Sequence, residues 1–222
     1  MRNCCIIVAG GNGLRMGTQI PKQFLLVREI PILMHTIRNF YDFDWSLQLI
    51  LVLPAGEIKT WADLCLQYHF DIPHQVIAGG ETRFQSVKNG LSLVTDSQLI
   101  AVHDGVRPLV SHSTITRCFE CAGEKGAAIP VVPVNESIRE GDMVSSLPVD
   151  RSRYFLVQTP QVFKTDILKK SYNQNYLPEF TDDASVVEHA GTTVQLVMGN
   201  RENIKITFPE DLLVADLFLK KG

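Results

Sequence analysis

The chain has 222 residues, of which 45% are hydrophobic and 20% are charged, and its formal net charge at pH 7 is -3. A chain of this size can bury one large core, so we predict a single domain over residues 1–222. The slight negative charge argues against a general nucleic-acid binder, which needs excess lysine and arginine to contact phosphates. Because there is no secretory leader pattern and no apolar run of roughly 20 residues, we expect a cytoplasmic protein without a membrane partner.

Apolar runs alternate with helical patterns along the chain. The runs are continuous, as is typical of strands covered on both faces, and they span 4–10, 47–54, 74–80, 99–105, 127–134, 192–199 and 203–208. Helical spacing appears between them, for example over 83–94, and the segment 209–221 starts with proline and ends in lysines, as a helix would. The alternation predicts an α/β fold with a mostly parallel sheet, helices on both faces, and ligands beyond the carboxyl ends of the strands.

The segment after the first predicted strand is rich in glycine and basic residues. It does not match a P-loop, because Arg15 and Met16 stand five residues after Gly10 and Gly11, where that motif requires glycine. Met16 also stands where a dinucleotide-binding fingerprint has glycine or alanine. Two interpretations remain: a solvent-exposed basic loop, or a turn whose backbone amides approach an anion, with Arg15 and Lys22 close to the same ligand.

Three further predicted strand ends carry glycine, acidic and basic residues. They are "IAGGETRFQS" at 77–86, "AVHDGVRP" at 101–108 with Asp104 and Arg107, and "NIKIT" at 203–207 with Lys205. Taken alone, Asp104 could simply cap a turn. Taken together, the strand ends predict a nucleoside triphosphate site in which catalysis consists mainly of positioning and charge neutralisation.

Residues 135–161 do not follow the alternation of strands and helices. A turn signal at Gly141 and Asp142 lies between short extended runs, and polar residues and prolines follow it. We therefore predict that 135–161 is a β-hairpin arm projecting from the sheet.

The five cysteines do not indicate a disulfide framework, since their number is odd and Cys4 and Cys5 are adjacent. Cys118 and Cys121 form a C-x-x-C within a helical pattern, but no second ligand pair stands at zinc-finger spacing. We interpret both as packing residues and predict no metal site made of protein ligands alone.

Six segments in order, "AGGNGLRMGTQIPKQF", "GGETRFQSV", "VHDGVRP", "VDRSRYFLVQTPQVF", "TDDASVVE" and "NIKIT", carry a resemblance that covers nearly the whole chain. They resemble the 2-C-methyl-D-erythritol 4-phosphate cytidylyltransferases of the non-mevalonate isoprenoid pathway. The resemblance implies a Rossmann-like nucleotidyltransferase fold and attack of the acceptor's phosphate on the α-phosphate of CTP. The products would be 4-diphosphocytidyl-2-C-methyl-D-erythritol and pyrophosphate. It also implies a homodimer formed by exchange of the hairpin arm.

Site residues follow from the same resemblance. Arg15, Lys22 and Lys205 are the expected catalytic residues, because they would neutralise charge on the triphosphate in the transition state. CTP would be bound by Ala9, Gly10, Gly11, Gly80, Glu81 and Ser86, and Mg²⁺ would be held mainly through the CTP phosphates. The acceptor would be bound by Asp104, Arg107, Ser137, Arg151, Thr159 and Thr181, with the arm residues coming from the partner subunit.

Some of these assignments have alternatives. Arg151 could be an ordinary exposed arm charge, and Thr181 is also a candidate helix N-cap. Glu81 stands where relatives often have aspartate, which leaves its side-chain contact with the nucleotide open. We interpret His103 as a structural neighbour of Asp104, since the attacking phosphate is already ionised and needs no base.

Two other functions remain in view. Ribitol 5-phosphate cytidylyltransferases share the glycine-rich loop and the "VRP" and "TPQ" signatures, although "TDDASVVE" is more similar to the methylerythritol enzymes. A nucleotide-binding regulatory module without turnover is the other alternative. The joint presence of Arg15, Lys22, Asp104, Arg151 and Lys205 argues against it, because binding alone does not require the whole set.

Overall fold

The computed structural model describes residues 2–10 and 20–220. Its centre is an eight-stranded sheet in the order β10-β7-β11-β6-β1-β4-β5, with β12 also paired with β7. The strands are β1 (Arg2–Val8), β4 (Gln48–Leu53), β5 (Gln75–Ala78), β6 (Ser97–Asp104), β7 (Ala127–Pro133), β10 (Phe155–Val157), β11 (Gln161–Lys164) and β12 (Gln195–Met198).

The sheet is mostly parallel. β1 runs parallel to β4 and β6, β4 to β5, and β12 to β7. β11 is antiparallel to both β6 and β7, and β10 is antiparallel to β7, so only β10 and β11 run against the common direction of the sheet. The predicted fold class is therefore confirmed, and the carboxyl ends of β1 and β6 meet at one edge of the sheet.

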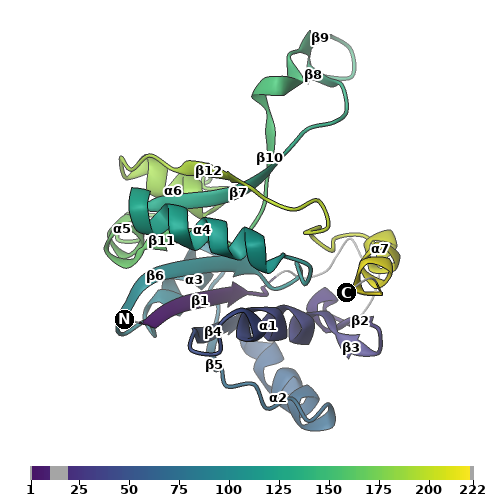
Figure 1. The fold of residues 1–222 in the computed structure, drawn as a ribbon, viewed down its shortest axis with the longest axis vertical. Coiled ribbons are helices and arrows are strands. Elements are labelled where there is room, and N and C mark those ends of the chain that lie inside the picture. Colours follow the sequence, from purple (N-terminus) through teal and green to yellow (C-terminus); the bar gives the residue numbers. More distant parts are fainter. Residues whose placement is uncertain (1, 11–19, 221–222) are drawn as a thin grey trace.

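Helices cover both faces of the sheet, as Figure 1 shows. Alternation along β1 explains why: Cys5 and Ile7 face a core cluster with α1 (Ile32–Phe43), α2 (Ile58–Gln67) and α4 (His112–Lys125). Cys4 and Ile6 face the opposite cluster, with α3 (Arg83–Leu91), α5 (Thr165–Ser171) and α6 (Asp183–His189). Cys118 of α4 is buried in the first cluster and Cys121 packs at its edge, as predicted.

The predicted strand over 203–208 is wrong. That stretch has no strand partner, and one backbone hydrogen bond, from Ile206 N to Val106 O at 3.0 Å, connects it to the segment that follows β6. Its apolar residues reflect packing instead of strand pairing: Ile206 is fully buried beside Val106 and Ala215 in a third, smaller core cluster. The helix expected after it is present as α7 (Pro209–Leu219), with proline in its first turn.

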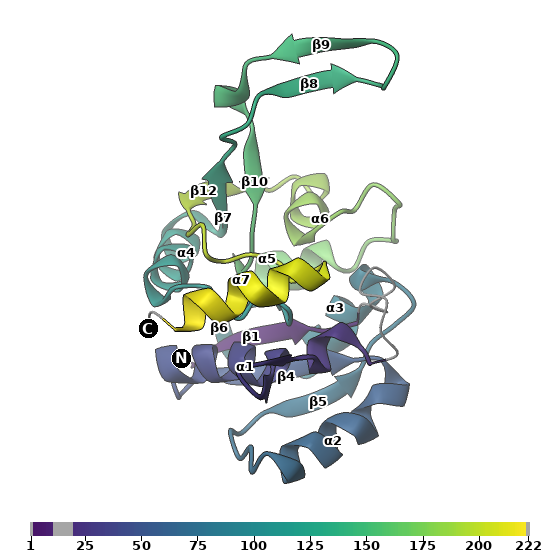
Figure 2. The same ribbon diagram turned by 90° about the vertical axis from the view of Figure 1, so that its right-hand side faces the viewer.

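The hairpin expected around Gly141 is present as β8 (Ile138–Gly141) and β9 (Ser146–Val149), a separate antiparallel pair. Gly141 has a φ of 132°, which favours glycine at this turn. Figures 1 and 2 show the pair projecting well beyond β7 and β10. The predicted boundary at 161 is too late, because Phe155–Val157 already pairs with β7 in the main sheet. The short "FLV" and "QVFK" runs were hidden by the polar residues between them.

Five shorter elements complete the described chain, two of them the 3-10 turns Ala55–Glu57 and Arg151–Arg153. Lys22–Phe24 forms a 3-10 turn directly after Pro21, and β2 (Leu26–Val27) pairs with β3 (Ile30–Pro31). No helix within residues 2–10 and 20–220 combines the length and apolar character needed to cross a membrane.

Candidate active site

A pocket of about 230 Å³ lies beyond the carboxyl ends of β1 and β6. Its walls come from five separate parts of the chain: the end of β1, the 3-10 turn at Lys22, the start of α3, the end of β6 with the residues just after it, and the segment after β12. The residues that line it are Val8, Ala9, Gly10, Lys22, Gln23, Gly80, Glu81, Thr82, Arg83, Ser86, Asp104, Val106 and Lys205. This is the edge of the sheet where the sequence places a nucleotide site.

A second pocket of about 290 Å³ lies against the first one. Its walls come from the start of α3, the end of β6, the β10–β11 junction, the residues before α6 and the segment after β12. The residues that line it are Arg83, Asp104, Arg107, Val157, Gln158, Thr159, Gln161, Thr181, Asp182 and Lys205. Arg83, Asp104 and Lys205 line both pockets, so a single group of charges separates two neighbouring binding spaces.

Asp104 is the centre of this group. Its Oδ2 lies 3.0 Å from Arg107 Nε and 3.1 Å from Lys205 Nζ, and its Oδ1 lies 4.0 Å from Arg83 Nε. Burial by itself raises the pKa of Asp104, but Lys205, Arg83 and Arg107 together outweigh it and hold that pKa well below its usual range. Asp104 is therefore a fixed negative charge near neutral pH, and it orients the cations around it.

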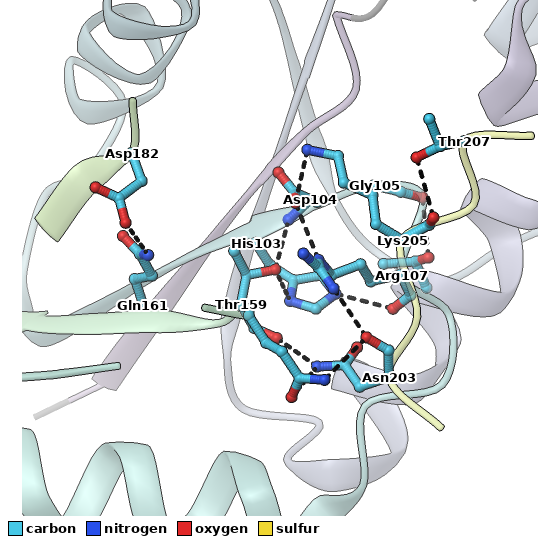
Figure 3. Close-up of polar contacts among 12 residues, drawn as sticks. His103, Asp104, Gly105, Arg107, Thr159, Gln161, Asp182, Asn203, Lys205 and Thr207 are labelled. Atoms are coloured by element: carbon cyan, nitrogen blue, oxygen red, sulfur yellow. Dashed lines mark hydrogen bonds and ion pairs between the residues drawn. The ribbon is translucent and has the colours of Figure 1, made fainter. Parts of the chain in front are cut away.

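The segment that carries Lys205 is held by amide side chains (Figure 3). Asn203 Nδ2 donates to Thr159 O at 2.8 Å, and Asn203 O accepts from Arg107 Nη1 at 2.8 Å. Gln158 Nε2 donates to Asn200 O at 2.9 Å and to Asn203 O at 3.3 Å. These bonds explain how a stretch without strand pairing still presents Lys205 at a defined place.

The "TDDAS" segment is anchored on the other side of Asp104. Asp183 is fully buried, and its Oδ2 accepts from Arg83 Nη2 at 2.6 Å while its Oδ1 accepts from Tyr172 OH at 2.6 Å. Gln161 Nε2 donates to Asp182 Oδ2 at 2.8 Å. The N-cap of α6 is Asp182, whose Oδ1 accepts from Ser185 N, so the alternative role of Thr181 as the cap is wrong.

The turn before α3 depends on glycine and a hydroxyl. A Cβ atom on Gly80 would lie 2.4 Å from Gln85 Cβ, so a side chain there would displace the helix start. Ser86 Oγ accepts from Gly80 N at 3.2 Å and donates to Thr82 O at 2.9 Å. The hydroxyl thus fixes the turn and keeps one lone pair for a further donor.

His103 belongs to a chain of three hydrogen bonds. Asp104 N donates to Thr159 Oγ1 at 3.1 Å, and His103 Nδ1 lies 3.0 Å from the same hydroxyl. His103 Nε2 lies 3.0 Å from Arg107 O, and because a carbonyl only accepts, Nε2 carries the proton and Nδ1 accepts from Thr159. Both ring nitrogens are engaged, which agrees with a structural role for this histidine.

Burial lowers the pKa of His103 from 6.5 to about 4. The unfolded chain therefore binds this proton more readily than the folded protein between those values, and the free energy of unfolding falls as pH drops from 6.5 toward 4. We expect His103→Asn to be less stable than wild type at pH 7. Its free energy of unfolding should fall less steeply between pH 6.5 and 4, and the two slopes should differ by up to about 1.4 kcal/mol per pH unit. Urea unfolding of wild type and His103→Asn at pH 7, 5.5 and 4.5 measures how the free energy of unfolding of each protein changes with pH. Equal slopes would contradict a neutral His103, since other histidines contribute equally to both proteins.

The structure brings most of the predicted site residues together. Ala9, Gly10, Lys22, Gly80, Glu81 and Ser86 line the first pocket, Arg107, Thr159 and Thr181 line the second, and Asp104 and Lys205 line both. The expectation that Thr159 serves the partner's site is therefore wrong for this residue: it follows β10 of the main sheet, and Asp104 N of its own chain donates to its hydroxyl. Gly11 and Arg15 lie outside the described residues. Ser137 and Arg151 are exposed in the arm, just outside its β8–β9 hairpin, and line neither pocket of their own chain.

Sequence reasoning missed the position of Arg83 and Gln161. Arg83 was visible as a basic residue at a strand end, but its partner Asp183 is 100 residues away in the sequence, so no local pattern joins them. Gln161 gave no signal, because a glutamine beside proline in "TPQVF" has no characteristic spacing with the residues before α6.

Comparisons with known proteins agree on one family. The chain matches the model of the IspD family, 2-C-methyl-D-erythritol 4-phosphate cytidylyltransferase, over residues 3–221. Proteins of that name from Phocaeicola vulgatus and Porphyromonas gingivalis are 54% identical over 219 residues and 52% identical over 215 residues. The first match covers 99% of this chain and 100% of the relative, and the second covers 96% of each.

The solved structures lead to the same conclusion. The crystal structure of 2-C-methyl-D-erythritol 4-phosphate cytidylyltransferase from Thermus thermophilus superposes with a TM-score of 0.81 at 30% identity, covering 99% of this chain and 100% of that one. The family model, both relatives and this solved structure each match nearly the whole chain. The chain belongs to the 2-C-methyl-D-erythritol 4-phosphate cytidylyltransferase family.

Proposed function

We propose that the protein transfers the cytidylyl group of CTP to 2-C-methyl-D-erythritol 4-phosphate in isoprenoid precursor biosynthesis. The products are 4-diphosphocytidyl-2-C-methyl-D-erythritol and pyrophosphate. The observation that carries this proposal is the pair of pockets that share Asp104, Arg83 and Lys205, because a transfer reaction needs its donor and acceptor side by side.

The first pocket takes CTP. Gly10 and Gly80 line this pocket without side chains, so the nucleotide can approach their backbone closely. Ala9 lines the same pocket, and Gly11, which lies outside the described residues, is assigned to CTP by the family resemblance alone. Ser86 Oγ, which keeps one lone pair, is suited to accept from the amino group of cytosine. Glu81 is exposed at the rim of this pocket, where a contact with the ribose is feasible.

In the proposed reaction an oxygen of the acceptor's phosphate forms a bond to the α-phosphorus of CTP. The bond from that phosphorus to the bridging oxygen breaks, and pyrophosphate leaves with the electron pair. Lys22 and Arg15 stabilise the additional charge on the five-coordinate phosphorus, and Lys205 keeps the attacking phosphate close. The acceptor's phosphate is ionised at neutral pH, so no protein base is needed.

The second pocket takes the acceptor, through Asp104, Arg107, Thr159 and Thr181. We propose that Ser137 and Arg151 complete this site from the partner subunit of an arm-exchanged homodimer. The arm supports the idea, because an isolated two-stranded hairpin is at best marginally stable and needs a packing surface. Its tip also carries apolar side chains that are exposed in the single chain, namely Met143, Val144 and Leu147.

Magnesium fits this site as an ion bound through the nucleotide. Asp104 already contacts three cations, so the donor groups of the pocket suit a hydrated ion that is coordinated mainly by phosphate oxygens, with Glu81 near the rim. When bound, the ion would neutralise charge on the triphosphate. We expect the enzyme to act in the cytoplasm, which its five free cysteines also favour.

The test is pyrophosphate release from CTP and Mg²⁺ with methylerythritol phosphate, with ribitol 5-phosphate, and without acceptor. We expect release with methylerythritol phosphate alone. Release only with ribitol 5-phosphate would keep the mechanism and change the acceptor. No release with either acceptor, from a protein that binds CTP, would favour a nucleotide-binding module instead.

A further inference from the structure

The two oxygens of the Asp104 carboxylate have different surroundings. Oδ2 contacts Arg107 Nε and Lys205 Nζ at 3.0 and 3.1 Å. No donor within residues 2–10 and 20–220 reaches Oδ1 at hydrogen-bond distance, and Arg83 Nε stands 4.0 Å from it. That separation is too long for a direct hydrogen bond. Two polar groups this far apart can be bridged by one oxygen atom that hydrogen-bonds to both.

Arg83 is held in place by groups outside the gap. Its Nη2 donates to Asp183 Oδ2 at 2.6 Å, and Tyr172 OH donates to the other oxygen of this fully buried acid at 2.6 Å. At the backbone, Thr82 and Gln85 form a capping box at the start of α3. Moving Nε toward Asp104 would strain or break the bond to Asp183 and leave a buried charge without its partner. The fold itself therefore keeps the gap open.

The gap faces the ligand spaces, because Arg83 and Asp104 line both pockets. Arg83 Nε–H is a donor and Oδ1 is an acceptor. A hydroxyl group is the uncharged group that accepts from the first and donates to the second with one oxygen atom. Arg107, one of the two other cations on Asp104, lines only the second pocket, which favours the acceptor as the source of that hydroxyl over the ribose of CTP.

We propose that Arg83 is a substrate-binding residue: its Nε and Asp104 Oδ1 together bind one hydroxyl group of the polyol phosphate acceptor. This inference rests on the proposed function and adds a specificity determinant to it. An acceptor that lacks the hydroxyl leaves both protein groups desolvated and unpaired, which a site of this kind rejects strongly. The chain Tyr172–Asp183–Arg83 then explains what the buried acid does: it orients a substrate contact.

The test combines substrate and enzyme changes in one cycle. Wild type and Arg83→Lys, which keeps a positive charge beside Asp183, are assayed with methylerythritol phosphate and with each of its single-deoxy analogues. We expect one analogue to lower kcat/KM of wild type by about tenfold to a hundredfold. The same analogue should lower kcat/KM of Arg83→Lys by less than about threefold, since that variant has already lost the contact with the hydroxyl.

Two further variants keep the test decisive. Tyr172→Phe leaves the Arg83–Asp183 contact in place and should discriminate against the deoxy analogue as wild type does. Arg83→Gln combined with Asp183→Asn removes both charges together and replaces Arg83→Lys if that protein does not fold. Thermal unfolding of each variant establishes that it is folded before kinetics are compared.

The possible results separate the two proposals. If the penalty for every deoxy analogue is the same in Arg83→Lys as in wild type, Arg83 is only a structural clamp and the inference fails while the function stands. If the coupling appears with 2′-deoxy-CTP and not with the acceptor analogues, the hydroxyl belongs to the nucleotide and the inference fails as well. A wild-type enzyme that does not turn over methylerythritol phosphate would refute the proposed function and this inference together.

Discussion

Lys22→Ala should lower kcat by about a hundredfold to a thousandfold while changing the affinity for CTP much less, the usual effect of losing one donor to the transition state. The structure gives the reason for so selective a loss. Lys22 follows Pro21 and begins a 3-10 turn that ends in Phe24, which is buried and stacked on Trp61 with ring centroids 6.2 Å apart. The backbone under Lys22 is thereby anchored on the core, so its charge can be positioned before the reaction begins.

Steady-state kinetics with methylerythritol phosphate and calorimetric titration with CTP measure the two quantities separately. Lys59→Ala is a suitable control, because Lys59 is an exposed lysine on α2 whose contact is a surface ion pair with Asp63 at 2.7 Å. It should leave kcat within about twofold of wild type. If Lys22→Ala weakened CTP binding and kcat by similar factors, Lys22 would be a ground-state binding residue and its catalytic assignment would be wrong.

The sequence predicts the frame of the fold well. Continuous apolar runs marked β1, β4, β6 and β7 because these strands are buried on both faces, and that is a local property of sequence. β5 and β12 were also found as apolar runs, although their residues are only partly buried or exposed. The same rule misjudged 203–208, where a buried Ile206 reflects packing against α7 rather than strand pairing. It also missed β10 and β11, since their pairing with β7 depends on how the chain returns from the arm.

The site shows a similar division. Glycine, acidic and basic residues at successive strand ends are visible in the sequence, and parallel topology brings them to one edge. What holds them in place is not visible. Asn203, which fastens the Lys205 segment to Thr159, and Asp183, which orients Arg83, act across 44 and 100 residues of sequence. Such contacts depend on the finished fold, so only the structure identifies them.

Mixing two nearly inactive variants, Lys22→Ala and Arg151→Ala, should restore about a quarter of wild-type activity if each site combines residues from both subunits. Random exchange makes half of the dimers mixed. In a mixed dimer one site has both substitutions and the other has neither, so half of its sites are intact. The placement of Arg151 motivates the experiment: it is exposed in the arm, lines neither pocket of its own chain, and donates to Asn135 O, where the arm begins.

A matched mixture provides the control. Lys22→Ala and Lys205→Ala alter residues that line one pocket of the same chain, so every site in their mixed dimer has a substitution and activity should not return. Native mass spectrometry of isotope-labelled subunits measures exchange in both mixtures. If activity returns in the mixture of Lys22→Ala with Arg151→Ala but not in the mixture of Lys22→Ala with Lys205→Ala, the arm completes the partner's site. Equal lack of recovery in both mixtures, with exchange demonstrated, would mean that Arg151 serves its own chain or no site at all, and the arm would then need another explanation than catalysis.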